Sequence, residues 1–514
     1  MKLLPSPTGI LWRGGDFTFP NPLPVRSAGR AARVLARQLK TAVGIDTTTD
    51  EGPGVDFHTD DTLAPEAYRL TVTPEGVTIW SADDAGAGWA VQTLLQLLPV
   101  HIHGPGPMEP SSLVVPAVDI TDAPAHGWRG SHIDVARHFL PLDGLLKHLD
   151  VMAAHKLNVL HLHLTDDQGW RLPVAKYPKL TEEGAWRPGT LVGHRPPPDE
   201  NDCDDVAEHD GVPHGGAYTE DELRHLVAYA AELGITVMPE IDMPGHMEAA
   251  IAAYPHLGAC DHVRHPRTAF GVSEHVLSLN DDVIQFCKDV LDAAMELFPG
   301  SPIHIGGDEC PSAEWFQDPA SLETMERHGL TTGAEAQAWF EREICAYLVA
   351  AGRRVVVWDE VLDAGAPDGV TIMVWRTREG QSRIEEAAQQ GLDVIAAPVG
   401  QTYLDYTQYD HPGEPLSIGG TTPLADVARL TDHMTVPEGR GHHLLGGQFQ
   451  LWTEYVRNWD RAEYQLWPRG AALAQQLWSG HVGDAGTLDG LGHHLDRLTA
   501  MQLNWCRPPR TETG

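Results

Sequence analysis

Residues 219–242, TEDELRHLVAYAAELGITVMPEID, contain the helix-to-strand step that decides the fold. Thr219 followed by Glu222 is the capping-box pattern that begins a helix, and Gly234 is the residue type that ends one in the left-handed conformation. The apolar run ITVMPEID that follows is typical of a strand buried on both faces of a parallel sheet. This segment therefore predicts a helix over 220–233 that leads into a buried parallel strand.

The same strand-helix pattern recurs from about residue 128 onward. Apolar residues with a 3.6-residue period predict a helix over 142–155, and further helices are predicted over 281–298, 335–351, 382–391, 461–478 and 488–505. Eight strands are predicted, over 131–136, 158–164, 235–242, 303–309, 353–360, 371–376, 393–398 and 444–452. Parallel strands need crossover helices and eight of them can close a sheet, so we expect a (β/α)8 TIM barrel. An open doubly wound sheet is the alternative, but no GxGxxG follows the first strand.

A smaller α/β unit precedes the barrel pattern. Residues 31–43 and 85–98 read as helices, and RLTVTPEGVTIW (69–80) reads as two strands around a Pro-Glu-Gly turn. The Pro- and Gly-rich segment 103–127 is the predicted boundary region. We therefore divide the chain into an N-terminal α/β domain (1–122), a barrel with C-terminal helices (123–505) and a tail (506–514). Residues 186–218 of the barrel are predicted to be a polar surface insertion.

Composition and charge narrow the class of function. The chain has 514 residues, and 36 Lys and Arg against 72 Asp and Glu give a net charge of −36. Nucleic acids and anionic membranes attract basic surfaces, so neither is an expected partner, and a neutral small molecule fits better. The start MKLLPSPTGILWRGG lacks an apolar run of signal-peptide length, and no stretch of about 18 apolar residues occurs, so we expect a cytoplasmic protein, or a secreted one if a leader is missing from this sequence. A monomer and a homodimer are both open. The six cysteines include no CxxC pair, which argues against a zinc ribbon.

Chemically active side chains gather at the predicted strand ends. In a TIM barrel these ends form the rim that carries the active site. A single tryptophan or acid there is explained by packing or helix capping, but such residues follow all eight strands. Indole faces stack on pyranose rings and carboxylates accept hydrogen bonds from hydroxyls, so the set indicates a sugar site. The residues are Arg137, His138, Asp166, Asp167, Asp242, His246, Asp308, Glu309, Trp358, Trp375, Tyr403, Asp405, Trp452 and Glu454.

The segment PIHIGGDEC (302–310) is the most informative of these ends. Its two glycines permit a close backbone approach, and Asp308 and Glu309 follow directly. Neighbouring side chains in extended chain point apart, so the two carboxyls should have different tasks. Glycosidases usually place two carboxylates on opposite sides of the scissile bond. Adjacent carboxyls instead suit substrate assistance, in which a 2-acetamido group of the sugar attacks its own anomeric carbon.

From Trp128 onward the chain resembles the family-20 glycoside hydrolases, the β-N-acetylhexosaminidases. HIGGDE is joined, in order along the chain, by the motifs IDVARHF, HLHLTDDQGWR, MPEIDMPGH, VVWDE, MVWR, TYLDY, LWTE and WPR. The first 120 residues look like the non-catalytic domain that commonly precedes the barrel there. The resemblance implies an exo-acting enzyme that removes terminal non-reducing β-linked GlcNAc or GalNAc by a retaining, oxazolinium mechanism, with neither a cofactor nor a metal.

The resemblance also implies roles for individual residues. Glu309 would be the general acid/base. Asp308 would accept a hydrogen bond from the acetamido N–H and stabilise the positive charge of the oxazolinium intermediate. Tyr403 would donate a hydrogen bond to the acetamido oxygen. The substrate-binding residues it implies are the pocket walls Trp358, Trp375 and Trp452, the hydroxyl partners Arg137, Asp405 and Glu454, and the supporting pair Asp166 and His246. Cys260 and Cys310 lie near positions that are bridged in some relatives, and we expect both to be reduced.

Three alternative functions are open at this point. His161 and His163 form a His-x-His pattern that metal-dependent barrel hydrolases also show, although both alternate with leucines as core residues do. A barrel without catalysis could keep the tryptophans and bind sugar only. A two-carboxylate glycosidase could use Asp242 or Asp405 as its nucleophile.

Overall fold

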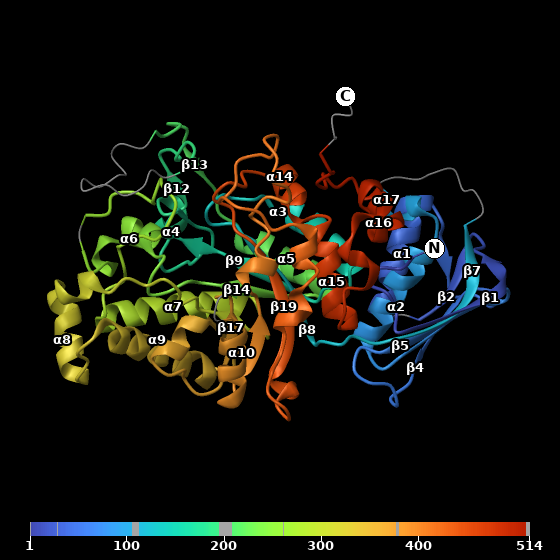
Figure 1. Ribbon diagram of the computed structural model, residues 1–514, viewed down its shortest axis with the longest axis horizontal. Helices are drawn as coiled ribbons and strands as arrows, with labels where there is room; N and C mark the ends of the chain where they lie inside the picture. The colour runs from blue at the N-terminus through green and yellow to red at the C-terminus, as the bar shows by residue number, and fades with distance from the viewer. Residues whose placement is uncertain are drawn as a thin grey trace.

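The computed structural model describes residues 2–27, 29–104, 113–194, 208–260, 262–376 and 380–509. A seven-stranded sheet with two helices forms one end of the molecule, and a closed eight-stranded barrel ringed by helices forms the other (Figure 1). The C-terminal helices lie between the two (Figure 1).

The N-terminal sheet is mixed and has the strand order β1-β7-β5-β6-β4-β2-β3. Helices α1 (Arg30–Val43) and α2 (Asp84–Leu97) share one apolar core with the sheet. The predicted helices and the predicted β5–β6 hairpin are confirmed. The segment expected to be only a boundary contains β7, which lies between β1 and β5 in the sheet. The strands are β1 (Gly9–Thr18), β2 (Leu23–Arg26), β3 (Thr47–Thr48), β4 (Val55–Thr59), β5 (Tyr68–Thr73), β6 (Gly76–Ser81) and β7 (Val114–Asp122).

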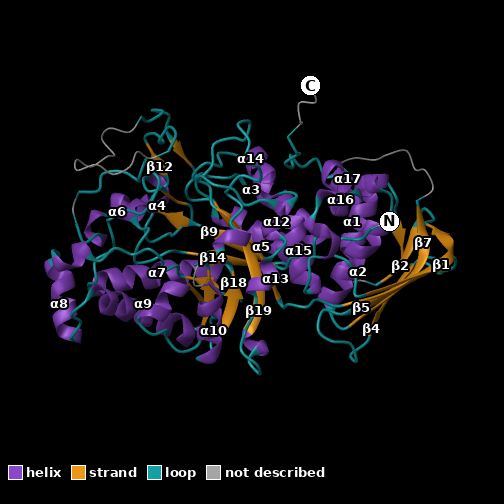
Figure 2. Ribbon diagram, viewed as in Figure 1, coloured by secondary structure: helices purple, strands orange, loops and turns teal. Residues whose placement is uncertain are grey.

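The second sheet is a closed barrel of eight parallel strands, which confirms the predicted fold (Figure 2). Its strands are β8 (Trp128–Asp134), β9 (Val159–His163), β14 (Thr236–Glu240), β15 (Ile303–His304), β16 (Val355–Trp358), β17 (Val370–Val374), β18 (Asp393–Ala396) and β19 (Leu444–Leu451). The surrounding helices include α3 (Leu142–Ala154), α5 (Glu220–Leu233), α7 (Asp281–Leu297), α8 (Pro319–His328), α9 (Gly333–Ala350) and α10 (Gly380–Gln389).

Helix α5 shows why the sequence folds locally as it does. The Thr219 side chain accepts from the Glu222 backbone N–H, and the Glu222 side chain accepts from the Thr219 backbone, so the capping box is complete. Gly234 ends the helix with a φ of 81°. Both signals are local, which is why the sequence alone located this helix.

The two long C-terminal helices predicted over 461–478 and 488–505 are each broken. Pro468 lacks a backbone N–H and holds the preceding residue extended, so the chain forms α14 (Trp459–Leu466) and then α15 (Arg469–Ser479). Gly492, with a φ of 30°, separates α16 (Leu488–Leu491) from α17 (His493–Ala500).

The insertion 186–218 is anchored at its base, and residues 195–207 of it lie outside the described part. Strands β12 (Trp186–Arg187) and β13 (His214–Gly215) pair there. The buried Arg187 guanidinium donates to the Arg137 carbonyl over 2.6 Å. The start of the predicted tail is also packed, because Cys506 is buried and its N–H donates to the Trp467 carbonyl. The tail's last five residues, 510–514, are not described.

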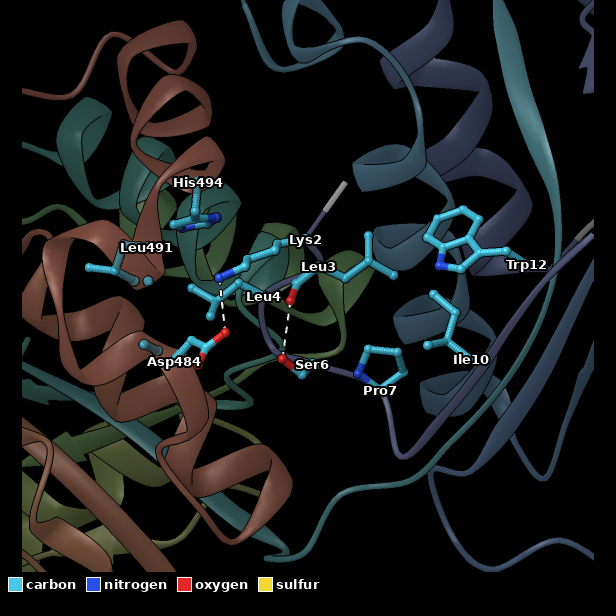
Figure 3. Close-up of a pocket in the computed structure, with 12 residues that line it drawn as sticks. Lys2, Leu3, Leu4, Ser6, Pro7, Ile10, Trp12, Asp484, Leu491 and His494 are labelled. Carbon is cyan, nitrogen blue, oxygen red and sulfur yellow. Dashed lines mark hydrogen bonds and ion pairs between the residues drawn. The ribbon is translucent and has the colours of Figure 1, made fainter.

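The two domains meet in a buried polar seam. The Lys156 ammonium from the end of α3 contacts the Asp122 carboxylate over 2.7 Å, and Trp478 of α15 donates to the same carboxylate. A cavity of about 220 Å³ lies near this seam, between the N-terminal segment and the C-terminal helices, with the Lys2–Asp484 ion pair at its edge (Figure 3). Among the described helices, none has both the length and the apolar character that a membrane crossing requires.

Candidate active site

The turn after β15 brings the paired carboxyls to the barrel rim. Gly306 and Gly307 have φ values of 68° and 94°, so the chain leaves the two-residue strand at once rather than extending to residue 309 as predicted. A Cβ on Gly306 would lie 1.8 Å from an oxygen of Asp242, and the Gly307 N–H donates to that carboxylate over 3.0 Å. The glycines thus permit a close approach to Asp242, a neighbouring side chain.

Asp308 and Glu309 occupy different environments, as expected. The Asp308 side chain is 15% exposed and that of Glu309 is 43% exposed. Burial raises the pKa of Asp308 well above its ordinary value, and the carboxyl of Asp242 raises it further. Glu309 has a φ of 46°, a left-handed conformation that is uncommon outside glycine. Such strain persists where the surrounding structure over-determines it, and this is often at a functional site.

His246 connects the paired carboxyls to the neighbouring strand end. Its Nδ1 lies 3.3 Å from Asp166 Oδ1 and 3.3 Å from Asp167 Oδ2. Its Nε2 lies 4.0 Å from Asp308 Oδ2 and 3.9 Å from Glu309 Oε2. Burial opposes a charge on the ring, but the carboxylates, Asp166 foremost, raise the pKa of His246 well above its ordinary value. His246 therefore lies between two acidic pairs, which favour its protonated form.

Arg137 is held rigidly at the next strand end. Its Nη2 contacts Asp166 Oδ2 over 2.8 Å, and its Nε donates to Gln168 over 3.2 Å. The guanidinium also lies 4.8 Å from the ring centroid of Trp452. Burial alone would raise the pKa of Asp166, but the charges of Arg137 and His246 hold it well below the ordinary range. These contacts leave Arg137 fixed beside the aromatic wall.

The predicted aromatic residues form one continuous wall. Trp358 and Trp452 have ring centroids 6.2 Å apart, Trp452 and Tyr403 are also 6.2 Å apart, and Tyr403 stacks on Trp375 at 6.3 Å. Tyr403 follows α11 (Val399–Thr402), and burial and the nearby Asp308 raise the pKa of its hydroxyl. A neutral phenol next to a carboxyl can donate a hydrogen bond to a ligand.

Asp405 and Glu454 lie together on the side of Arg137. Burial raises the pKa of both carboxyls; the charge of Glu454 adds to the effect at Asp405, whereas Arg137 opposes it at Glu454. Asp405 Oδ1 is buried and has no hydrogen-bond partner within the described residues. An unsatisfied buried acceptor calls for a partner, and a sugar hydroxyl would supply one. His138, by contrast, is buried against Thr453, to whose carbonyl its ring lies within 2.6 Å.

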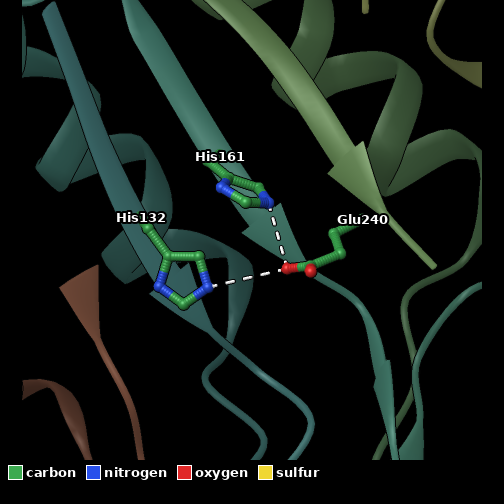
Figure 4. Close-up of side chains that lie close together, drawn as sticks. All are labelled: His132, His161 and Glu240. Atoms are coloured by element: carbon green, nitrogen blue, oxygen red, sulfur yellow. Dashed lines mark ion pairs between the residues drawn. The ribbon is translucent and has the colours of Figure 1, made fainter. Parts of the chain in front are cut away.

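Glu240 is a functional candidate that sequence reasoning did not identify. It lies inside the barrel, where its carboxylate is 3.0 Å from His161 Nε2 and 3.8 Å from His132 Nε2 (Figure 4). The same carboxylate is 2.6 Å from His163 Nδ1 and 3.0 Å from His304 Nδ1. Trp358 Nε1 donates to Oε1 of the Glu240 carboxylate over 2.9 Å. The sequence signal for Glu240 was an acidic residue at the end of the largely apolar run TVMPE.

His161 and His163 are thus buried core residues. Besides Glu240, His161 meets Gln448 over 2.8 Å and His163 meets Asp166 over 2.8 Å. His132, His161 and Glu240 place ligand atoms within 4.8 Å of one another, so the chelator assay below decides the metal-dependent alternative.

Glu360 is the second residue that was missed. Trp375 Nε1 donates to both of its carboxylate oxygens over 3.1 Å. Burial and the nearby Asp308 raise the pKa of Glu360 to about 8. With Glu309 it lines a cavity of about 290 Å³ beside the rim. The sequence signal for Glu360 was its position two residues after Trp358, at the end of the same predicted strand.

The catalytic-domain model of glycosyl hydrolase family 20 matches residues 126–481, and the model for domain 2 of that family matches residues 1–123. The chain belongs to glycosyl hydrolase family 20. β-Hexosaminidases from Porphyromonas gingivalis and Vibrio furnissii are 37% and 35% identical, over 87% and 92% of this chain. The chain spans 56% of the first relative's length and 76% of the second's.

Solved structures of the family share the fold. The family-20 exo β-N-acetylglucosaminidase of Vibrio harveyi, in complex with N-acetylglucosamine, superposes with a TM-score of 0.85 and 29% identity, covering 99% of this chain and 78% of that one. The resemblance seen in the motifs is thereby confirmed over both domains. In the described part of the chain, Cys260 and Cys310 are not bridged to each other.

Proposed function

We propose that this family-20 hydrolase is an exo-acting β-N-acetylhexosaminidase that releases terminal non-reducing β-linked GlcNAc or GalNAc from oligosaccharides. The observation that carries the proposal is the consecutive pair at the rim, with Asp308 buried beside Tyr403 and Glu309 exposed. A buried acid and a neutral phenol suit an acetamido group, and an exposed acid suits the glycosidic oxygen. The V. harveyi relative binds N-acetylglucosamine, which supports the substrate class.

The proposed reaction is retaining and substrate-assisted. The acetamido carbonyl oxygen attacks the anomeric carbon while the glycosidic C–O bond breaks and Glu309 gives its proton to the leaving oxygen. Asp308 accepts a hydrogen bond from the acetamido N–H, and as an anion it stabilises the positive oxazolinium. Tyr403 donates to the acetamido oxygen. Water then adds to the anomeric carbon, and Glu309 takes the proton from that water.

The remaining rim residues bind and orient the sugar in this proposal. Trp358, Trp375 and Trp452 enclose the acetamido group and one face of the pyranose. Arg137, Asp405 and Glu454 hold the hydroxyls furthest from the scissile bond, which closes the site at the non-reducing end. Asp166 and His246 position Glu309.

The geometry argues against a protein nucleophile. Asp242 is fully buried and accepts from the Gly307 N–H, and burial raises its pKa to about 7, with Glu240 adding to the effect. Full burial and the hydrogen bond from the Gly307 N–H leave Asp242 poorly placed to attack a sugar.

The test is a panel of 4-nitrophenyl β-glycosides assayed with and without a chelator. We expect turnover of the 2-acetamido sugars, a rate on the 2-hydroxy counterpart lower by several orders of magnitude, and no loss with chelator. A thiazoline mimic of the intermediate should bind far more tightly than the free sugar. Comparable rates on 2-acetamido and 2-hydroxy sugars would exclude acetamido participation, and loss of activity with chelator would favour the metal-dependent alternative.

A further inference from the structure

A cluster of three metal-ligating side chains lies outside the proposed active site. Cys260, His275 and Glu314 come from three separate segments, and their Sγ, Nδ1 and carboxylate atoms lie within 4.8 Å of one another. Cys260 Sγ is 3.3 Å from His275 Nδ1, and Glu314 Oε1 is 2.8 Å from the same nitrogen. Cys260 and Glu314 line a hollow of about 1010 Å³ at the protein surface. None of the three contributes to the reaction proposed above.

The geometry does not fit a Cys-His-Glu catalytic triad. In a triad the histidine uses one ring nitrogen for the nucleophile and the other for the carboxylate. Here sulfur and carboxylate both meet Nδ1, so no proton relay through the ring is possible. Cys260 also hydrogen-bonds Glu314, so all three side chains contact one another, as ligands of one shared cation do.

The spacing is close to that of a tetrahedral metal site. Zinc ligands at about 2.3 Å for sulfur and about 2.0–2.1 Å for nitrogen and oxygen lie about 3.3–3.6 Å apart at tetrahedral angles. The Cys260–His275 separation of 3.3 Å would need to open by about 0.3 Å to reach the sulfur–nitrogen value, and the His275–Glu314 separation of 2.8 Å by about 0.5 Å to reach the nitrogen–oxygen value. Small rotamer changes of the Cys260 and Glu314 side chains would give both separations.

We infer that Cys260, His275 and Glu314 bind one divalent cation of the zinc class, with the fourth position open to the hollow. A thiolate and an imidazole select Zn²⁺ or Co²⁺ over Mg²⁺ or Ca²⁺, which prefer oxygen ligands. Three protein ligands leave a coordination position for water.

The site would hold two rim loops together. The Ala259 N–H donates to the Val276 carbonyl, and Trp315 Nε1 donates to the Leu277 carbonyl, so the segments already touch. Glu314 lies in the short helix η4 (Ala313–Phe316), five residues after Glu309. A cation here would therefore tie the chain that follows the catalytic pair to the loop that follows β14.

Cobalt binding tests the site without reference to catalysis. The full chain is stripped with chelator and titrated with Co²⁺, and we expect a thiolate-to-cobalt absorption band that saturates at one ion per chain. Cys260→Ser should abolish the band, and Glu314→Gln should weaken Co²⁺ and Zn²⁺ binding by at least about 100-fold, since losing even an outer partner costs 10–100-fold. Glu274→Gln is the matched control, because Glu274 lines the same hollow and the change removes the same charge.

A second readout covers a variant that fails to fold. Zn²⁺ should slow alkylation of Cys260 in the wild-type protein, followed peptide by peptide with mass spectrometry, and should not do so in Glu314→Gln. The inference is overturned if the wild-type protein shows no saturable band, or if Cys260→Ser, Glu314→Gln and Glu274→Gln all bind Co²⁺ equally. Glycosidase activity takes no part in these measurements, so the outcome is independent of the proposed function.

Discussion

At the scale of single residues, the different exposure of Asp308 and Glu309 predicts different mutational effects. Glu309→Gln removes the proton donor, so turnover of chitobiose-like substrates should fall by about 10²–10⁴-fold. An aryl glycoside has a good leaving group and should lose much less. Asp308→Asn should slow both substrates alike, by about 10²-fold, because the acetamido group needs its charge whatever the leaving group. Steady-state kinetics on both substrates would show this, and equal losses for Glu309→Gln on the two would contradict its role.

The pair Asp242 and Asp308 predicts a pH effect. The proposed reaction needs Asp308 as an anion, and its pKa is raised, so kcat/KM should fall as the pH drops through that raised value. Asp242→Asn removes a carboxyl that raises this pKa but keeps an acceptor for the Gly307 N–H. The acid limb of the kcat/KM profile should therefore move to lower pH, by about one unit.

Glu341→Gln is the control for this shift. Glu341 is also buried, and burial raises its pKa to about 7, but it lies on α9 behind Gly307. The acid limb of the kcat/KM profile should stay at the same pH in Glu341→Gln. An unchanged limb in Asp242→Asn would show that the two carboxyls do not interact as described.

At the scale of elements, the turn after β15 depends on Gly306. Gly306→Ala places a Cβ against Asp242 and should lower kcat/KM by about 10²-fold, since a displacement near 1 Å at an active site has that effect. Gly300→Ala is the matched control, with a similar φ of 74° but open space around the new Cβ. It should cost about 1–2 kcal/mol of stability and leave the kinetics unchanged. Similar kinetic losses in both variants would mean that backbone strain, and not the contact with Asp242, is responsible.

Helix boundaries marked by capping residues could be predicted from the sequence, whereas boundaries without such residues could not. Thr219, Glu222 and Gly234 carry their own capping chemistry, so α5 was located to the residue. Strand β15 was predicted to be seven residues long and has two, because the glycines that look like strand residues in sequence turn the chain toward Asp242. Only the fold shows what a glycine approaches.

At the scale of the whole molecule, the buried ion pair of Lys156 with Asp122 joins the two domains. Lys156→Met would leave the Asp122 carboxylate buried without its cation, which should destabilise the protein by about 3–5 kcal/mol. Urea unfolding followed by circular dichroism measures this, while KM should stay unchanged because the seam lies away from the rim. Lys179→Met, which removes an exposed pair with Glu183, should unfold like the wild-type protein. If Lys156→Met did so too, the seam would not be a determinant of stability.

The sequence by itself determined the alternation of strands and helices and therefore the barrel, because hydrophobic periodicity is a local property of the chain. It also determined which residues, from Arg137 to Glu454, lie at the rim, because the carboxyl ends of parallel strands meet on one side of a barrel. The tertiary structure alone decided that Glu240 contacts four histidines and Trp358, that Glu360 accepts from Trp375, and that Asp242 lies behind the turn that carries Asp308 and Glu309. These partners are up to 118 residues apart in the chain. Their contacts, and the pKa shifts that burial imposes on them, exist only once the barrel has closed.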